Sequence, residues 1–490
     1  MKNRIPVVRP HLDALADHPT IQATLLMLLT ALLYTLKLGG NGLANYDDCF
    51  YAQKAKEILQ SGSWLHLTLG GMPAFENPPF FMWLLAFSYK IFGVGEFAAL
   101  LPSALMGFGA VFLTYRLAKN AYGPWEGLCA GFVLATTTVF AKYSRRAMMD
   151  TTMTFLVLAA LSAFRMGLLR HPAWFLLFGA AAGTAIMTKS VLGFFPLLIA
   201  VLFLAWTRRF RVLFSGWFLG SCLLALGWGG VWYAHETWVY GKVFLDAHFG
   251  WLIFQRGFHA EPQPWWHHLS YLRDLLVFYW PWLPVSVAGG ALLLRSFRRL
   301  SDDDRLILLW PLTILAVMSA MQTRVFWYIL PAFPAFSIWA ARALGRWVPP
   351  ARRRGIVQAA LGGGLLVVLT LGVLPVRFDS VREPDVRAIA PDVKHLGREA
   401  GTKIGNYRLP YHGINNALLF YSDHAAYPEW STPEQLREAF ADPATVLCVI
   451  DRRDLDALQK EGFHAFPVRM AWPRALIANR PVDTSGVVRP

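Results

Sequence analysis

The sequence predicts an α-helical polytopic membrane protein that ends in a soluble α/β domain. Of its 490 residues, 55% are hydrophobic and 16% are charged, and the mean hydropathy is +0.38. Soluble domains carry about 25% charged residues, so this deficit indicates a membrane protein. Apolar runs of about 17–25 residues, long enough to cross a bilayer, recur as far as about residue 375, and a soluble composition follows.

The apolar runs predict about eleven transmembrane helices within residues 1–376. Two polar stretches, 39–95 and 235–273, form the expected outer loops. Residues 377–490 form the expected soluble domain. The expected crossings are at about 21–38, 96–118, 124–140, 151–169, 173–188, 191–206, 212–233, 274–294, 306–321, 325–343 and 356–373.

Charges at the helix ends predict the orientation of the chain. One set of ends carries basic clusters such as 208–211 and 352–354, and the other carries carboxylates such as Asp47, Glu76 and Asp150. Basic residues are retained in the cytoplasm. The N-terminus is therefore predicted inside and the C-terminal domain outside. The same pattern accounts for the formal net charge of +15 and argues against nucleic acid as a partner.

The four cysteines are too few and too scattered for a disulfide framework or a metal cluster. Cys129 and Cys222 fall in apolar runs, where cysteine packs as a small apolar residue. Cys49 and Cys448 are both expected on the outer side, and a disulfide between them stays open.

The first outer loop contains the polar stretch 45–79. Residues 48–59 place their apolar side chains on one helical face, which predicts a helix on the membrane surface that ends at Gly62. Pro78 and Pro79 then begin a second helix at 80–92. It is short for a full crossing and is therefore expected to be interfacial.

The C-terminal residues carry signals of an α/β domain. Thr432 is predicted to cap a helix, with Pro433 at its first position and Gln435 completing a capping box. Residues 445–450 predict a buried strand and 454–461 the helix after it. We find no catalytic motif in this part of the sequence, which leaves a binding or a structural role open.

Three outer carboxylates are candidates for chemistry. Asp47 and Asp48 lie together at the start of the surface helix. Helix capping accounts for one of them, but a carboxylate at a membrane boundary also suits a general base acting on a hydroxyl or amine. Asp150 lies close to Arg145 in the sequence, and its alternative is an ordinary interfacial position.

Several cations predict a site for a phosphate or pyrophosphate. Arg145, Lys189, Arg256 and Arg324 fall on the predicted outer side, and Tyr328 shares a helical face with Arg324. Cationic groups form strong hydrogen bonds with phosphate oxygens. The alternative is a set of interfacial anchors, which accounts for each residue but not for their collection on one side.

Glu76 precedes Asn77, Pro78 and Pro79 in a turn of the first outer loop. It is a solvated turn residue, a polar anchor for the substrate or a metal ligand. A divalent metal would need partners, and His248 is one of several histidines that could supply one. No pair of these histidines has a distinctive spacing, so no metal or other cofactor is assigned.

Over about residues 20–340, these elements resemble, in consistent order, the motifs of the GT-C membrane glycosyltransferases. Asp47-Asp48-x-x-Tyr51-Ala52 resembles the acidic first-loop motif, and 75–79 resembles the Phe-Glu-Lys-Pro-Pro turn. The sequence looks more like the bacterial branch that holds the aminoarabinose transferases of lipid A (ArnT-like) and the relatives of protein O-mannosyltransferases. Three further stretches resemble the Arg-x-x-x-x-Asp, Thr-Lys-Gly and Lys-x-x-x-Tyr-x-x-Pro elements: 145–150, 188–190 and 324–331.

The resemblance implies an inverting transfer of a sugar from a polyprenyl (undecaprenyl) phosphate donor. The acceptor would be lipid A, another glycolipid, a glycan or a protein on the periplasmic side of the bacterial inner membrane. Asp47 would be the catalytic carboxylate, and Lys189, Arg256, Arg324 and Tyr328 would hold the donor phosphate. No nucleotide would be needed, in agreement with the lack of a glycine-rich phosphate loop.

The sequence departs from the family pattern at three positions. Asn77 and Arg324 stand where the family has lysine, and Phe50 stands where a basic residue is usual. Arg324 keeps the charge and can bind phosphate in a bidentate way. Two alternatives from other classes are a flippase or transporter of the lipid-linked sugar and a non-catalytic binder. The lack of mid-span charge and of inverted repeats argues against transport.

Overall fold

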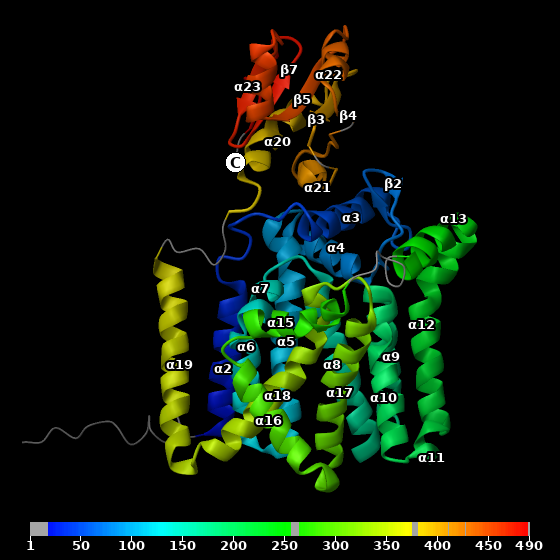
Figure 1. The fold of residues 1–490 in the computed structure, drawn as a ribbon, viewed down its shortest axis with the longest axis vertical. Coiled ribbons are helices and arrows are strands. Elements are labelled where there is room, and N and C mark those ends of the chain that lie inside the picture. The colour runs from blue at the N-terminus through cyan, green and yellow to red at the C-terminus, as the bar shows by residue number, and fades with distance from the viewer. Residues whose placement is uncertain (1–17, 256–263, 375–380, 410, 427, 489–490) are drawn as a thin grey trace, which may run out of the picture. The chain divides into compact units, whose positions relative to one another are not determined.

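The computed structural model describes residues 18–488 except 256–263, 375–380, 410 and 427 (Figure 1). The chain divides into two compact units. Unit 1 comprises Met1–Leu38, Phe75–Phe81 and Leu100–Val376. Unit 2 comprises Gly39–Ala74, Met82–Ala99 and Arg377–Pro490, so most of the first predicted outer loop belongs with the C-terminal residues.

Unit 1 is a helical bundle whose longer helices follow the apolar runs of the sequence (Figure 1). α5 begins in unit 2 and continues into unit 1. In chain order, the α-helices are α2 (Pro19–Thr35), α5 (Glu96–Tyr122), α6 (Pro124–Thr136), α7 (Thr138–Ser144), α8 (Met149–Leu169), α9 (Trp174–Lys189), α10 (Phe195–Trp206), α11 (Phe210–Leu213), α12 (Gly216–Tyr240), α13 (Lys242–Leu245), α15 (Ser270–Phe278), α16 (Leu283–Arg295), α17 (Asp302–Ala320), α18 (Phe333–Trp347) and α19 (Pro350–Val373). Shorter helical turns are η1 (Ser190–Phe194), η2 (Asp246–Gln255, a π-helix), η3 (Trp265–Leu269), η4 (Phe297–Arg299) and η5 (Phe326–Ala332).

Among the described residues, five helical segments are long and apolar enough to cross a membrane. They are α5, α8, the run Trp174–Trp206 that contains α9 and α10, α12 and α19. The shorter helices α2, α4 (Phe80–Phe92) and α16 are also apolar. The chain is therefore a multi-pass helical membrane protein. The total of about eleven crossings stays a prediction.

Three of the expected crossings contain interruptions. The run 124–140 is divided at Thr137 into α6 and α7, and the run 274–294 is divided between α15 and α16. Pro281 lies in the second gap, and because proline lacks a backbone N–H and clashes with the preceding turn, it disfavours a continuous helix there. The run 325–343 begins as η5 before it becomes α18. A hydropathy average over the window does not register these breaks.

Aromatic and small residues hold the centre of unit 1 together. The Phe164 ring of α8 lies 5.5–6.3 Å, between centroids, from Phe175 and Phe178 of α9, Phe203 of α10 and Phe218 of α12. Gly179 and Gly183 let α9 approach α12, because a Cβ at these positions would lie 2.3 Å and 2.8 Å from carbonyl oxygens of α12. This four-residue spacing of small side chains is common where membrane helices pack closely.

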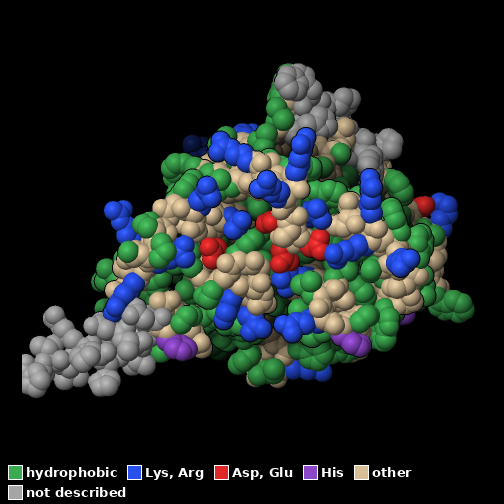
Figure 2. All heavy atoms as spheres, turned by 90° about the horizontal axis from the view of Figure 1, so that it is seen from below, with side chains coloured by type: hydrophobic (Ala, Val, Ile, Leu, Met, Phe, Trp, Pro, Cys, Tyr) green, Lys and Arg blue, Asp and Glu red, His purple; other side chains and the backbone are tan. Residues whose placement is uncertain are grey.

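The end of unit 1 where α17 begins carries a network of charges. Figure 2 shows acidic side chains in the middle of this face, surrounded by Lys and Arg. Ser301 caps α17 through a capping box with Asp304. Asp303 accepts two hydrogen bonds from Arg165 of α8, at 2.5 and 2.7 Å. The Tyr122 hydroxyl donates to Asp304 at 2.8 Å. These contacts join α5, α8 and α17.

Unit 2 contains two helices from the first predicted outer loop and a five-stranded sheet from the C-terminal residues. α3 (Asp47–Ser61) ends at Gly62, as predicted, with the left-handed φ of 75° that favours glycine. β1 (Thr68–Leu69) and β2 (Met72–Pro73) form a short hairpin whose turn residues Gly70 and Gly71 both have positive φ. α4 (Phe80–Phe92) has the predicted bounds.

The C-terminal part of unit 2 is a mixed α/β fold, as predicted. Its strands lie in the order β4-β3-β5-β7-β6, with β3 parallel to β4 and β5 and the remaining pairs antiparallel. Thr432 and Gln435 form the predicted capping box. The elements are α20 (Pro384–Leu396), β3 (Lys403–Tyr407), α21 (Tyr411–Ser422), β4 (Glu429–Trp430), α22 (Pro433–Phe440), β5 (Val446–Asp451), α23 (Arg452–Lys460), β6 (Phe466–Met470) and β7 (Arg474–Ala478).

The hydrophobic core of this fold lies between β5 and the helices α22 and α23. Cys448 and Ile450 of β5 pack with Leu436 of α22 and Leu455 and Leu458 of α23. Cys448 is a free, buried thiol in this core, and Cys49 is likewise free and buried, so the two do not form the disulfide that the sequence left open.

The contact between Arg165 and Asp303 yields a first prediction. Their side chains are 11% and 20% exposed, and removal of one partner from a buried pair costs about 3–5 kcal/mol. Arg165→Met should therefore lower the melting temperature strongly, and Arg165→Met/Asp303→Asn should lower it by less than the sum of the single changes. Arg305→Met, which affects the more exposed pair with Asp302, should cost less than about 1 kcal/mol. Additive effects of the two single changes would show that Arg165 and Asp303 are not energetically coupled.

Candidate active site

Lys189, Asp150 and Tyr328 come together in unit 1 although the sequence separates them widely. Lys189 is the last residue of α9, and Asp150 lies in the first turn of α8. The Lys189 ammonium forms an ion pair with Asp150, and the two side chains are only 12% and 3% exposed. The same ammonium lies 4.4 Å from the centroid of the Tyr328 ring in η5, within the range of a cation–π contact.

The backbone after Lys189 has an unusual conformation. α9 stops there because Ser190 takes φ 50° and ψ −126°, which side-chain-bearing residues rarely adopt. Strained backbone of this kind is concentrated at functional sites. The position also favours a cation, since the C-terminal end of a helix carries a partial negative charge. Lys189 therefore ends the helix with its ammonium directed to Asp150.

The turn at 75–79 is anchored through Phe75. The Phe75 ring lies 5.0 Å from Tyr240 and 5.6 Å from Phe244, between centroids. Its carbonyl oxygen accepts a hydrogen bond from His248 Nδ1 at 2.7 Å. His248 Nε2 lies 3.1 Å from the Ser190 hydroxyl. His248 thus links this turn to the residue that follows Lys189.

These contacts bear on the metal hypothesis. Both ring nitrogens of His248 take part in hydrogen bonds, and Glu76 is exposed to solvent. The part of the chain that the structure describes contains no group of three or more His, Cys, Asp or Glu residues arranged to hold a metal ion. The arrangement does not favour His248 as a ligand.

Two of the cations expected to bind phosphate contact backbone carbonyls. Arg145 donates to the carbonyl oxygens of Leu33 and Leu36 at 2.7 and 2.8 Å, which satisfies the C-terminal end of α2. Arg324 donates through Nε and Nη2 to the Ser319 carbonyl oxygen near the end of α17, at 3.3 and 3.0 Å. These contacts favour a structural role for Arg145. For Arg324 they favour a structural role that is combined with binding of phosphate. Arg256 lies outside the described residues.

The acidic pair at the start of α3 is divided between two environments in unit 2. Asp48 is fully buried, and its Oδ2 accepts from Arg382 Nη1 at 3.1 Å and from the Ala44 backbone N–H at 3.1 Å. Asp47 is half-buried and is the first residue of the helix. Asp48 therefore has a structural role, because it joins the start of α3 to Arg382. Of the two residues, Asp47 is the better candidate for chemistry. Arg382 was not identified from the sequence, because no pattern associates it with Asp48 over 334 residues.

The division between Asp47 and Asp48 can be tested through stability. Asp48→Ala removes the carboxylate from Arg382, and we expect a loss of about 3–5 kcal/mol because the pair is buried. Asp47→Ala removes a half-buried carboxylate at a helix N-terminus, where the interaction with the helix dipole contributes about 0.3–1 kcal/mol, so we expect a smaller loss. Thermal unfolding of the purified full-length chain measures both. Equal melting temperatures for the two variants would be incompatible with a structural Asp48.

His248 predicts a pH dependence of stability. Burial lowers its pKa from 6.5, although its bond to Phe75 and the charge of Glu76 oppose this shift. Between the lowered value and 6.5 the unfolded chain binds more protons, so the free energy of unfolding falls as the pH drops through that window. His248→Phe should flatten this dependence. It should also cost about 1–3 kcal/mol at higher pH, because the Phe75 carbonyl loses its donor.

Melting temperatures across the acidic range check the His248 prediction. The exposed His171, in the same unit, provides the matched control His171→Phe. If both variants retain the slope of the unchanged protein, His248 is not its source.

Comparison with known proteins agrees with the fold and the motifs. Residues 76–228 match the model of a family described as dolichyl-phosphate-mannose-protein mannosyltransferase. The undecaprenyl phosphate-α-4-amino-4-deoxy-L-arabinose arabinosyl transferase 1 of Pseudomonas fluorescens is 28% identical over 373 residues, covering 74% of this chain and 66% of that protein. The corresponding protein of Pseudomonas savastanoi pv. phaseolicola is 29% identical over 376 residues, covering 74% and 68%. The alignments thus span about two thirds of these relatives.

Solved structures show the same fold. ArnT from Cupriavidus metallidurans bound to undecaprenyl phosphate superposes with a TM-score of 0.74 at 19% identity, covering 96% of this chain and 99% of that one. The oligosaccharyltransferase of Archaeoglobus fulgidus gives a TM-score of 0.53 at 14% identity, covering 83% and 64%. These findings confirm the resemblance inferred from the motifs: the chain is similar to the ArnT-like glycosyltransferases and has the fold of ArnT.

Proposed function

We propose that this protein transfers a glycosyl group from a polyprenyl phosphate to an acceptor on the periplasmic side of a bacterial inner membrane. The single observation that carries the proposal is the buried cluster of Lys189, Asp150 and Tyr328 in unit 1. Support for the donor class comes from relatives named as undecaprenyl phosphate-dependent transferases and from the similar ArnT fold bound to undecaprenyl phosphate.

Lys189 suits the task of stabilising the departing phosphate. An ammonium has three N–H donors; one contacts Asp150, and the others can bind phosphate oxygens. Asp150 and Tyr328 restrict the position of the ammonium before the donor binds. Charge held in place beforehand is worth more in a dry site than in water. The cluster would therefore stabilise the negative charge that develops as the donor bond breaks.

The proposed reaction is a single displacement. An acceptor hydroxyl or amine attacks the anomeric carbon, the bond from that carbon to the phosphate oxygen breaks, and polyprenyl phosphate leaves with the bonding electrons. The proton of the acceptor passes to the carboxylate of Asp47. General base catalysis of this kind contributes about 10²–10⁴-fold. Tyr328 and Arg324 would assist in holding the phosphate. Glu76, in the turn that precedes α4, would serve as a polar anchor for the substrate.

The proposal predicts which variants lose product. Asp47→Asn should lower transfer by about 10²-fold or more. Lys189→Met/Asp150→Asn, which removes both charges and so avoids an unpaired buried ion, should lower transfer by about 10²–10³-fold while the protein stays folded. Mass spectrometry of lipid and envelope fractions from cells with and without the chain measures the product as one added sugar mass.

The control for this experiment is a charge-removing change away from the cluster. Arg305 lies in the first turn of α17, whereas Arg324 follows the last turn of that helix. Arg305→Met should therefore leave the product unchanged. Full transfer by the double variant would refute the role of Lys189. Movement of intact donor across the membrane without a covalent product would favour the transporter alternative instead.

A further inference from the structure

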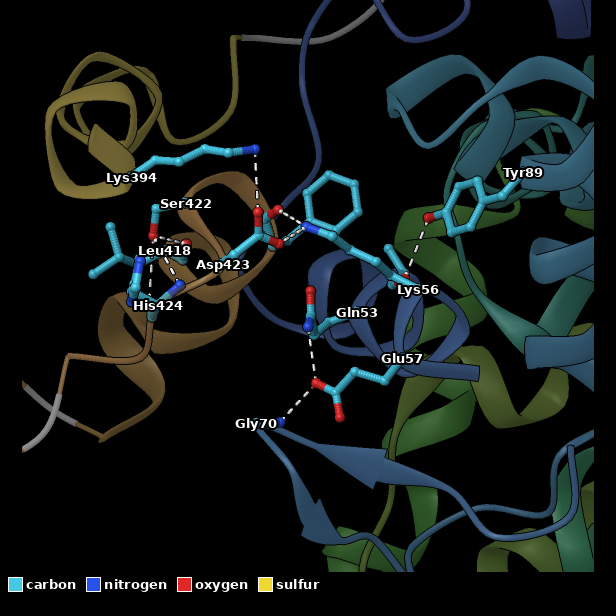
Figure 3. Close-up of polar contacts among 12 residues, drawn as sticks. Gln53, Lys56, Glu57, Gly70, Tyr89, Lys394, Leu418, Ser422, Asp423 and His424 are labelled. Atoms are coloured by element: carbon cyan, nitrogen blue, oxygen red, sulfur yellow. Dashed lines mark hydrogen bonds and ion pairs between the residues drawn. The ribbon is translucent and has the colours of Figure 1, made fainter. Parts of the chain in front are cut away.

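A cavity of about 460 Å³, with mostly polar residues in its lining, lies in unit 2 along the C-terminal half of α3. Its walls come from α3, from the turn of the β1–β2 hairpin and from the end of α21 with the residues that follow (Figure 3). Its volume is within the range of small-molecule sites, about 300–1,000 Å³. The cluster of Lys189, Asp150 and Tyr328 in unit 1 contributes no residue to it, so the cavity is a separate feature.

One wall of the cavity is a carboxylate whose hydrogen-bonding capacity is used. Glu57 Oε1 accepts from Gln53 Nε2 at 2.8 Å and from the Gly70 N–H at 2.7 Å. Its Oε2 accepts from the Thr68 hydroxyl at 2.5 Å and from the Gly71 N–H at 3.3 Å. An ionised carboxylate offers about four such sites. Glu57 therefore shapes the wall and has little capacity left for a cation.

The second carboxylate of the cavity is also compensated. Asp423 pairs with Lys56 and, at 3.1 Å, with Lys394 (Figure 3). Burial raises the pKa of Asp423, but the two lysines outweigh it and bring the pKa below its usual value. The Asp423 carboxylate therefore stays ionised and its charge is neutralised locally. A phosphate would meet two carboxylates here, and the lysines are already engaged.

The remaining polar groups are neutral. Burial lowers the pKa of His424, which keeps its ring uncharged near neutral pH. Gln60 and Ser61 are exposed at the rim. Gln53 is only 3% exposed, and its side-chain oxygen has no hydrogen-bond partner among the described residues. This oxygen is itself shielded from solvent, so the polar side chains that a ligand can reach are those of Gln60, Ser61 and His424.

The chemistry of the cavity selects a neutral ligand with many hydroxyl groups. Glu57 already accepts from the Thr68 hydroxyl and the Gly70 and Gly71 N–H groups. The exposed Gln60 amide and the neutral His424 ring remain for a ligand, and each can both donate and accept hydrogen bonds. Leu419 and Ala425 add an apolar surface against which the C–H face of a sugar ring can pack. We propose that this cavity binds a saccharide unit of the acceptor, other than the unit that receives the transferred sugar. This inference rests on the proposed glycosyltransferase function.

The length of α3 sets the spacing between the two acceptor contacts. Asp47 begins the helix, whereas Gln53 and Gln60 follow six and thirteen residues later. At 1.5 Å per residue these positions lie about 9 and 20 Å along the helix from Asp47. A single sugar ring is too small to bridge the longer distance. The acceptor would therefore carry an extended glycan or a further sugar attached to its core.

Binding can be measured separately from transfer. Saturation-transfer difference NMR on the protein in detergent, with maltose, N-acetylglucosamine and N,N′-diacetylchitobiose as neutral probes, should show contact with at least one saccharide. Gln60→Trp, which fills the rim, should weaken that contact at least fivefold. Gln459→Trp, an equally exposed glutamine at the end of α23, should have no effect.

Three outcomes would overturn the inference. They are no contact with any of the three saccharides, unchanged contact in Gln60→Trp, and competition by inorganic phosphate at the same site. Asp47→Asn separates this inference from the proposed function, because it should lower transfer by about 10²-fold or more and retain saccharide contact. With the natural acceptor, Gln60→Trp should raise the KM for the acceptor at least fivefold while kcat and the KM for the donor stay unchanged. A fall in kcat alone would contradict an acceptor-binding role.

Discussion

The ion pair between Lys189 and Asp150 is the contact on which the candidate site depends. Each charge alone would be costly in a buried position, because a close partner must replace the lost hydration. The pair joins the end of α9 to the start of α8, and the ring of Tyr328 brings η5 against the same ammonium. A cation suited to binding a phosphate thus also fixes three backbone segments relative to one another.

The parts of the fold that could be predicted from the sequence are those governed by local patterns. Apolar length located the long helices, Gly62 ended α3, and Thr432 with Gln435 formed the capping box. The interruptions at Thr137 and before α18 were not predicted, because they depend on packing against neighbouring helices rather than on hydropathy. Helix ends in particular depend on tertiary contacts.

The candidate site was predictable as a group of residues but not contact by contact. The collection of Lys189, Asp150 and Tyr328 on one side was visible in the sequence, and their convergence agrees with it. Sequence could not show that Arg145 binds carbonyl groups more than a hundred residues away. For the same reason Arg382 was not identified. Long-range bonds from a side chain to a distant backbone or side-chain group leave no periodic pattern.

The close contact of α9 with α12 restricts how the proposed donor site could change over evolution. Gly183 lies six residues before Lys189, about 9 Å along the same helix. A Cβ there would lie 2.8 Å from the Ala225 carbonyl oxygen, which is backbone, and 3.0 Å from the Trp228 ring. A larger residue there would displace the whole helix and carry the lysine with it. The packing of α9 against α12 therefore fixes the position of Lys189. Adaptation to a different lipid-linked sugar would more readily proceed through the turn at 75–79, where Glu76 is exposed to solvent.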